Sequence, residues 1–208
     1  MYHYAHYRED DVDRLLPVIR AFPLALVVSC TRGNFLASHL PLIATRKPDG
    51  KLVLLGHLDA NNPQASELDS AQVYIVFAGP NAYISPNVYV TRQLPTWNYI
   101  AVHATGRCAL EKPGLKILDD IERLVTQVEP EAGGWALDKT EERVRKLAPL
   151  ICRLSIEVDH VEGRFKLSQE KQGPDRCAAT DHLLADNPSL RPLVEQLFRK
   201  RETNDELT

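Results

Sequence analysis

The sequence predicts a β-rich α+β fold, in which an antiparallel β-barrel carries flanking helices. Three observations predict it. Strand-like apolar runs follow one another along the chain, turn signals separate them at short intervals, and helical periodicity is confined to the start, middle and end. Because short turns join antiparallel neighbours, this pattern favours a barrel over a doubly wound parallel sheet.

The first elements are a helix and a three-stranded meander. Residues 10–22 carry apolar side chains at helical spacing, and Asp10 or Asp11 is available as the N-cap. The strands are expected over residues 24–31, 35–45 and 51–58, joined by turns at Arg32-Gly33-Asn34 and at Asp49-Gly50.

The rest of the chain alternates between strands and helices. Asn62-Pro63 is typical of an N-cap followed by proline at the first helical position, and predicts a short helix to about Leu68. Gly79-Pro80-Asn81 predicts a turn, and the segment from Pro174 predicts helical pieces. Further strands are expected over residues 73–78, 82–85, 99–110 and 151–161, and helices over 115–128 and 140–147.

The length of 208 residues fits one large domain with an appendage. We expect residues 1–170 to form the barrel domain. Residues 171–208 are expected to form a C-terminal helical extension that packs on the barrel or trails from it.

Charge and cysteine usage exclude several classes of function. The net charge is −3, from 25 basic and 28 acidic residues, and no basic recognition helix is evident, so we expect no strong direct DNA binding. The four cysteines show no zinc spacing, and no metal site is expected. Cys30, Cys108 and Cys152 lie in strand-like runs and are expected in the core. No apolar run approaches the ~20 residues of a membrane span, so a cytoplasmic location is expected.

Four segments could carry chemistry, and each also has a structural explanation. His39, in the run from Ala37 to Leu42, could bond a ligand or be a satisfied strand histidine. The run from Gly56 to Pro63 ends a strand and opens a helix, which suits a phosphate or is simply a capped helix. The aromatic residues from Tyr83 to Tyr99 suit a planar ligand, a subunit interface or core packing. The segment from Glu162 to Gln169 could contact an anion or be a solvated strand end.

Taken together, these segments resemble the PaiB-like family of FMN-binding negative transcriptional regulators, over about residues 1–180. The resemblance rests on the ordered motifs Ala37-Ser38-His39-Leu40-Pro41-Leu42, Gly56-His57-Leu58, Asn62-Pro63-Gln64, Gly79-Pro80-Asn81-Ala82-Tyr83-Ile84-Ser85-Pro86, Pro95-Thr96-Trp97-Asn98-Tyr99, Val102-His103 and Glu162-Gly163-Arg164-Phe165-Lys166-Leu167-Ser168-Gln169.

The resemblance implies a split β-barrel related to pyridoxamine-phosphate oxidases and flavin reductases. It also implies a homodimer with FMN in the groove between subunits, and the aromatic segment from Tyr83 to Tyr99 is expected at or near that interface. We expect the phosphate near His57, Asn61 and Asn62, and Lys166 and its neighbours closing the site from the partner subunit. The expected cofactor contacts are Ser38, His39, Leu40, His57, Asn61, Asn62, Trp97, Asn98, Lys166, Ser168 and Gln169.

The sequence departs from the family pattern at two positions. Ala60 stands where an arginine is common, and Ala65 where an aromatic residue is common. The lost cation predicts weak or absent FMN in the purified protein.

Two alternatives to a regulator stay open, namely a flavin-dependent oxidoreductase and a barrel without cofactor that serves as an interaction module. No residue is singled out as catalytic; His39, His57 and His103 are the groups that titrate near neutral pH.

Overall fold

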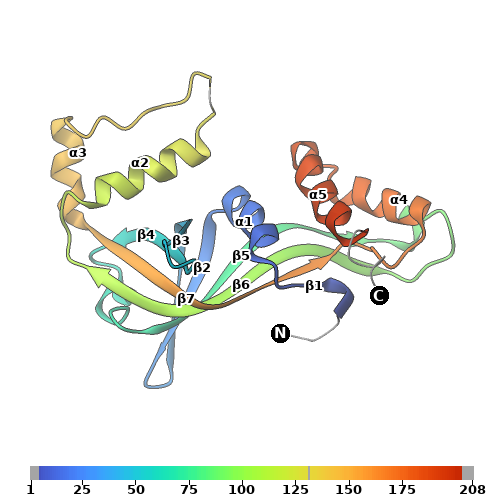
Figure 1. Ribbon diagram of the computed structural model, residues 1–208, viewed down its shortest axis with the longest axis horizontal. Helices are drawn as coiled ribbons and strands as arrows, with labels where there is room; N and C mark the ends of the chain where they lie inside the picture. The colour runs from blue at the N-terminus through green and yellow to red at the C-terminus, as the bar shows by residue number, and fades with distance from the viewer. Residues whose placement is uncertain (1–4, 131, 203–208) are drawn as a thin grey trace. The chain divides into compact units, whose positions relative to one another are not determined.

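The computed structural model describes residues 5–130 and 132–202, with side chains as far as residue 198 (Figure 1). The chain divides into two compact units. Unit 1 comprises residues 1–21, 78–102 and 162–208, and unit 2 comprises residues 22–77 and 103–161. Three long strands run from one unit into the other.

Unit 2 contains a ring of antiparallel strands. The sheet order is β1-β7-β4-β3-β2-β5-β6, and a further pairing of β7 with β6 closes the ring. Every register determined for the pairs is antiparallel. The predicted antiparallel barrel is therefore confirmed. Its strands are β2 (Leu24–Thr31), β3 (Asn34–Arg46), β4 (Leu52–Asp59), β5 (Gln72–Ile84), β6 (Thr96–Glu111) and β7 (Ile151–Lys166).

Two tight turns shape the meander, as the sequence predicts. Thr31 and Asn34 pair directly, and Arg32 and Gly33 between them have φ values of 51° and 85°. A two-residue hairpin loop with both residues at positive φ matches the twist of the strands it joins. Gly50, with φ of 86°, turns the chain between β3 and β4.

The strands of unit 2 have a buried inner face and an outer face. On β2, Ala25, Val27 and Ser29 are buried, whereas the residues between them are more exposed. Part of the outer face is covered by α2 (Ile117–Val128), whose Leu124 packs against Ile43 and its buried neighbours.

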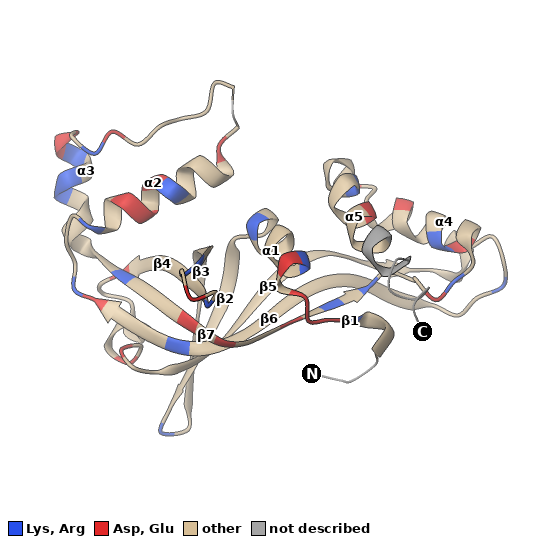
Figure 2. Ribbon diagram, viewed as in Figure 1, with Lys and Arg blue, Asp and Glu red and all other residues tan. Residues whose placement is uncertain are grey.

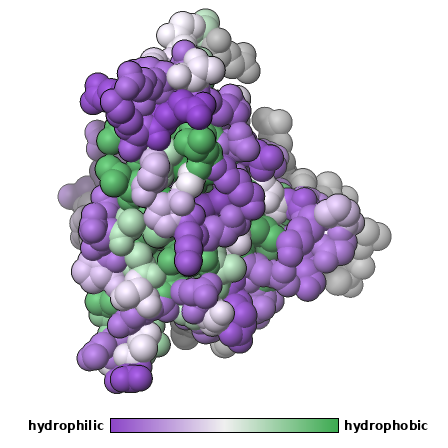
Figure 3. Space-filling view, turned by 90° about the vertical axis from the view of Figure 1, so that its left-hand side faces the viewer, coloured by the Kyte–Doolittle hydropathy of each residue, from purple (hydrophilic) through white to green (hydrophobic). Residues whose placement is uncertain are grey.

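The helix α3 (Glu142–Leu147) and the 3-10 helix η4 (Ala148–Leu150) follow the loop after α2. Ala148 and Val144 of this segment pack against α2. Figure 3 looks at this side of the molecule, where green hydrophobic side chains lie between purple hydrophilic ones.

Unit 1 holds both ends of the chain and the remaining parts of the long strands. The strand β1 (Arg8–Glu9) pairs with β7, and Ile84, Tyr89 and Ala179 form a buried cluster. The predicted division into residues 1–170 and 171–208 concerns domains, and it stays a prediction. The helices of unit 1 are η1 (Ala5–Tyr7), α1 (Val12–Ala21), η3 (Pro86–Val88), α4 (Gly173–Leu183), η5 (Pro188–Leu190) and α5 (Arg191–Glu202).

Three local predictions were wrong. The segment Gly79-Pro80-Asn81 does not turn the chain, because β5 continues through it. The strand β2 pairs with β5 only as far as Phe77. Pro80 lies beyond this pairing, so its missing N–H breaks no hydrogen bond between β5 and β2. The strand β7 extends five residues beyond its predicted end, since β1 supplies a partner there. Cys30 is exposed, because it points to the outer face of β2.

Candidate functional site

The first candidate segment forms a hydrogen-bonded cap at the 3-10 helix η2 (Pro63–Ser66). Asn62 is the N-cap, as predicted: its Oδ1 accepts the Gln64 N–H at 2.9 Å, and its Nδ2 donates to Ser38 Oγ at 3.0 Å. The Ala65 N–H donates to the Asn62 carbonyl at 2.8 Å, and Pro63 has no N–H. The first amides of this short helix are thus already used, so they do not provide the free donors that the phosphate prediction assumed.

Gln64 fixes this cap to the barrel. Its side chain is 1% exposed, and its Nε2 donates to the Val27 carbonyl, Ser29 Oγ and the Leu36 carbonyl at 3.0–3.3 Å. These bonds cross from η2 to both β2 and β3. Gln64 therefore holds Asn62 and Ser38 in place.

The residues predicted from β3 point in two directions. Leu40 is buried in the core, and Ser38 lies on the same side and bonds Asn62. His39, between them, is exposed on the outer face. Side chains alternate along a strand, so one ligand cannot contact all three through their side chains.

His57 lies on the outer face of β4, in the part that α2 covers. It pairs with Arg153 of β7, and burial lowers the pKa of its imidazole while the carboxylate of Asp120 opposes that shift. A half-buried, neutral imidazole is a poor partner for a phosphate. The structure thus separates His57 from the cap formed by Asn62 and Ser38.

An ion network ties α2 to the sheet beside His57. Arg153 Nε donates to Asp120, and its Nη1 donates to Glu111 of β6. The hydrogen bond from Lys116 is the main reason that the pKa of Glu111 is lowered, and Arg153 contributes as well. Figure 2 shows acidic and basic residues mixed along α2 and α3. These two helices therefore do not present the continuous basic surface that binds nucleic acid.

The residues predicted from unit 1 include a buried network. Ser168 Oγ bonds both Asn98 Nδ2 at 2.9 Å and Asn98 Oδ1 at 3.1 Å, and it also bonds Tyr89 OH at 3.2 Å. Asn98 is fully buried and Ser168 nearly so. Gln169 accepts the Leu167 N–H at 2.7 Å and donates to two backbone carbonyls. These three predicted contacts hold unit 1 together, and their polar atoms already have partners.

Four of the predicted residues offer groups at the surface. His39 and Asn61 are exposed. Trp97 is 52% exposed, and its Nε1 donates to Asn81 Oδ1 at 3.2 Å. Lys166 is half-buried, and its Nζ bonds Thr96 Oγ1 at 2.5 Å. Trp97 and Lys166 both belong to unit 1, and an aromatic surface and an ammonium group are side chains that suit a phosphate-bearing, planar cofactor.

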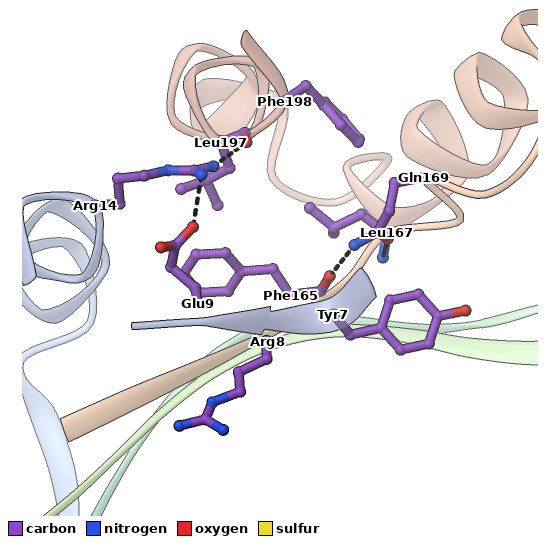
Figure 4. Close-up of a pocket in the computed structure, with 9 residues that line it drawn as sticks. All are labelled: Tyr7, Arg8, Glu9, Arg14, Phe165, Leu167, Gln169, Leu197 and Phe198. Atoms are coloured by element: carbon purple, nitrogen blue, oxygen red, sulfur yellow. Dashed lines mark hydrogen bonds and ion pairs between the residues drawn. The ribbon is translucent and has the colours of Figure 1, made fainter. Parts of the chain in front are cut away.

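A small pocket in unit 1 is lined in part by Gln169, one of the predicted cofactor contacts (Figure 4). Phe165, Leu167 and Phe198 line it together with Arg14, which pairs with Glu9 at 2.6 Å and donates to the Leu197 carbonyl. Its cavity volume of about 20 Å³ lies far below the ~300–1,000 Å³ typical of ligand sites.

Sequence reasoning missed one polar pair on the outer face of unit 2. Tyr74 OH and His103 Nδ1 lie 2.8 Å apart, and they come from β5 and β6. His103 stood among the titratable candidates, but Tyr74 was in no motif. The available signal was the alternation of β5, in which Tyr74 is the outward residue between buried Val73 and Ile75.

The ring of antiparallel strands defines a split-barrel protein. A family model described as "Putative FMN-binding domain" matches residues 1–160. The chain belongs to this family, and FMN is the cofactor that membership indicates, as the sequence resemblance predicted.

Two curated relatives match most of the chain. The protease synthase and sporulation protein PAI 2 of Bacillus subtilis is 27% identical and covers 96% of this chain and 98% of that protein. An uncharacterized protein of Emericella nidulans is 28% identical and covers 85% of this chain and 87% of that protein.

Two solved structures share the fold at 15% identity and a TM-score of 0.59. They are an FAD and heme binding protein from Mycobacterium smegmatis and the flavocytochrome Anf3 from Azotobacter vinelandii. The first match covers 83% of this chain and 80% of that chain, and the second covers 84% and 73%. In the described residues, no helix is long and apolar enough to cross a membrane.

Proposed function

We propose that the protein is an FMN-binding regulator of the PaiB-like type that works as a homodimer in the cytoplasm. The observation that carries this proposal is the match of the FMN-binding family model to residues 1–160, with a sporulation-protein relative that covers nearly the whole chain. All four cysteines are unpaired, which suits a reducing compartment.

The cofactor contacts are proposed at the predicted residues whose side chains stay accessible. In unit 1, Trp97 supplies an aromatic surface and Lys166 supplies the charge for the phosphate. The predicted contacts other than these two and the exposed His39 and Asn61 have partners of their own and act by shaping the barrel. These residues contribute to FMN binding by fixing the position of the backbone around the cofactor.

Dimerisation is supported by the apolar surface of unit 1. Val90, Leu94, Trp97 and Tyr83 are large hydrophobic residues that are exposed on or between β5 and β6. Tyr and Trp are favoured at subunit interfaces. Light scattering is expected to give about twice the chain mass of 23.4 kDa, and a monomer at micromolar concentration would contradict the dimer.

Regulation is proposed to be indirect with respect to DNA. The net charge is −3, and the charges on α2 and α3 are mixed in sign. Phosphate contacts by clustered Lys and Arg supply most of the affinity of DNA-binding proteins. A salt-dependent gel shift at nanomolar protein on a defined operator would show direct binding instead.

The test of FMN binding is calorimetric titration, followed together with the visible absorption spectrum. Because Ala60 removes a cation from the family pattern, the wild type is expected to bind FMN at about micromolar concentration. Replacing Lys166 with alanine removes a charge-assisted contact worth ~1.5–3 kcal/mol, so the affinity falls by at least about tenfold. Lys171→Ala is the matched control, since that lysine pairs with Glu170 at 3.6 Å.

Two results would overturn parts of this proposal. If the wild type shows no heat of binding and no spectral change at about 1 mM FMN, flavin binding is refuted. Equal affinities for the wild type and Lys166→Ala remove Lys166 from the site and leave the family assignment in place.

A further inference from the structure

The loop between β5 and β6, residues 85–95, is held by a single carboxylate of α4. Asp175 Oδ1 accepts the backbone N–H groups of Val90 at 2.7 Å and Thr91 at 2.9 Å. Asp175 Oδ2 accepts the Thr91 hydroxyl at 2.5 Å and Gln93 Nε2 at 3.1 Å. We call these four hydrogen bonds the Asp175 clamp. Asp175 is 2% exposed and lies in the first turn of α4, so the clamp fixes the loop to a helix of unit 1.

The first half of the loop is fixed as well. Ser85 caps the 3-10 helix η3 through its Oγ, and buried Tyr89 bonds Ser168 Oγ at 3.2 Å. The hydrogen bonds of the clamp, that of the Thr91 hydroxyl first, lower the pKa of Asp175. The clamp is therefore charged at neutral pH, and charged acceptors make the stronger hydrogen bonds. The loop backbone thus has a defined position before any partner binds.

This ordered loop presents large apolar side chains to solvent. Val90 is 71% exposed and Leu94 is 81% exposed. Exposed Tyr83 and Trp97 flank the loop at the ends of β5 and β6, with ring centroids 6.0 Å apart. An unrestrained loop can turn its apolar side chains inward, whereas the Asp175 clamp holds the backbone that carries them. Apolar and aromatic groups that are ordered in advance suit the centre of a protein interface.

The loop and its flanking strands carry almost no charge. Residues 78–101 contain one charged residue, Arg92, although 25% of the whole chain is charged. Charged residues are depleted at the centre of protein interfaces. In a two-fold dimer the same patch of both copies meets itself. A nearly uncharged patch does not repel its own copy, and it offers no charge pattern that selects a different partner. The second copy of this chain is therefore the occupant that fits.

We propose that residues 85–95 are a preformed docking loop for the second copy, and that Asp175 is the positioning residue that sets the strength of the dimer. The proposal rests on the homodimer proposed above and adds that α4 controls it. Asp175 is too buried to offer contact area to a partner, so it acts through the loop. A loop that must become ordered during binding lowers affinity, and the clamp removes that cost.

The experiment measures the dimer dissociation constant by sedimentation at a series of concentrations. It compares the wild type with Asp175→Ala, Leu94→Ser and the double variant. Each single substitution is expected to raise the dissociation constant at least about tenfold, the first by releasing the loop and the second by removing an apolar contact. The two effects are expected to be less than additive, because Leu94 is no longer positioned once the clamp is lost.

Amide hydrogen exchange reports on the clamp without reference to the dimer. Exchange of the Val90 and Thr91 amides, measured on monomer at low concentration, is expected to be faster in Asp175→Ala and unchanged in Leu94→Ser. Asp181→Ala is the matched control, since Asp181 is an exposed carboxylate of the same helix that pairs with Arg191 at 2.7 Å. Its dissociation constant is expected to lie within about twofold of the wild-type value.

The outcomes separate this proposal from the homodimer itself. A wild-type dissociation constant in folded Asp175→Ala would overturn the clamp and leave the homodimer in place. Fully additive effects of Asp175→Ala and Leu94→Ser would overturn it as well, because Asp175 would then act independently of the loop. Should Asp175→Ala fail to fold, Thr91→Val takes its place, since it removes one bond of the clamp from an exposed residue. A wild-type monomer at micromolar concentration would overturn both proposals.

Discussion

Replacing Asp120 with asparagine tests how α2 is held to the barrel. Asp120 is 5% exposed and accepts a hydrogen bond from Arg153, whose only other carboxylate partner among the described residues is Glu111 of β6. The substitution keeps the shape of the side chain and removes its charge. Arg153 is then left with one carboxylate in place of two.

The expected cost follows from burial. A hydrogen bond between charged groups contributes ~1.5–3 kcal/mol. Breaking a fully buried pair costs more, ~3–5 kcal/mol, but Arg153 is 16% exposed and keeps Glu111. We therefore expect a loss of about 2 kcal/mol, which corresponds to a fall in Tm of roughly 4–8 °C for a chain of this size.

Thermal unfolding by circular dichroism measures the fall in Tm, and NMR titration of His57 gives a second signal. The carboxylate of Asp120 raises the pKa of His57 against the effect of burial, so its removal is expected to lower that pKa further. Asp119→Asn is the control, because Asp119 is an exposed residue of the same helix that pairs with Lys139, and no change in Tm is expected. If the two variants unfold at the same temperature, the network does not anchor α2.

Three further predictions concern other parts of unit 2. Burial lowers the pKa of His57 below 6.5, so the unfolded chain binds the proton more tightly. The free energy of unfolding should therefore fall as the pH drops below about 6.5. Urea unfolding at pH 7.5 and pH 5.5 measures this fall, which should be smaller in His57→Gln than in the wild type. Burial raises the pKa of the Cys108 thiol to about 12, so Cys108 should react with a disulfide reagent at pH 8 only after unfolding, whereas exposed Cys30 reacts at once. A Cβ at Gly106 of β6 would lie 2.3 Å from the carbonyl oxygen of Glu157 on β7. Gly106→Ala should therefore destabilise the protein by ~1–3 kcal/mol, as measured by denaturant unfolding. An unchanged unfolding midpoint would contradict the close approach of these two strands.

Local signals in the sequence determined the order of the elements. Glycine at positive φ closes the β2–β3 turn at Gly33 and the turn at Gly50, and Asn62 caps η2 through its own side chain. Each of these signals depends on atoms within a few residues of one another. For this reason the antiparallel barrel and its helices could be predicted without knowing what packs against what. The family motifs in the sequence also predicted the cofactor, FMN.

Only the tertiary structure decided which side chains meet. Strand alternation and register separate His39 from Ser38, and α2 covers His57. The same registers bring Tyr74 to His103 and Asn98 to Ser168, which are 29 and 70 residues apart in the chain. A one-residue change of register would turn each of these side chains to the opposite face. The sequence by itself determined the elements and the residue types of the site, and the packing of strands far apart in the chain determined which of those residues a ligand can reach.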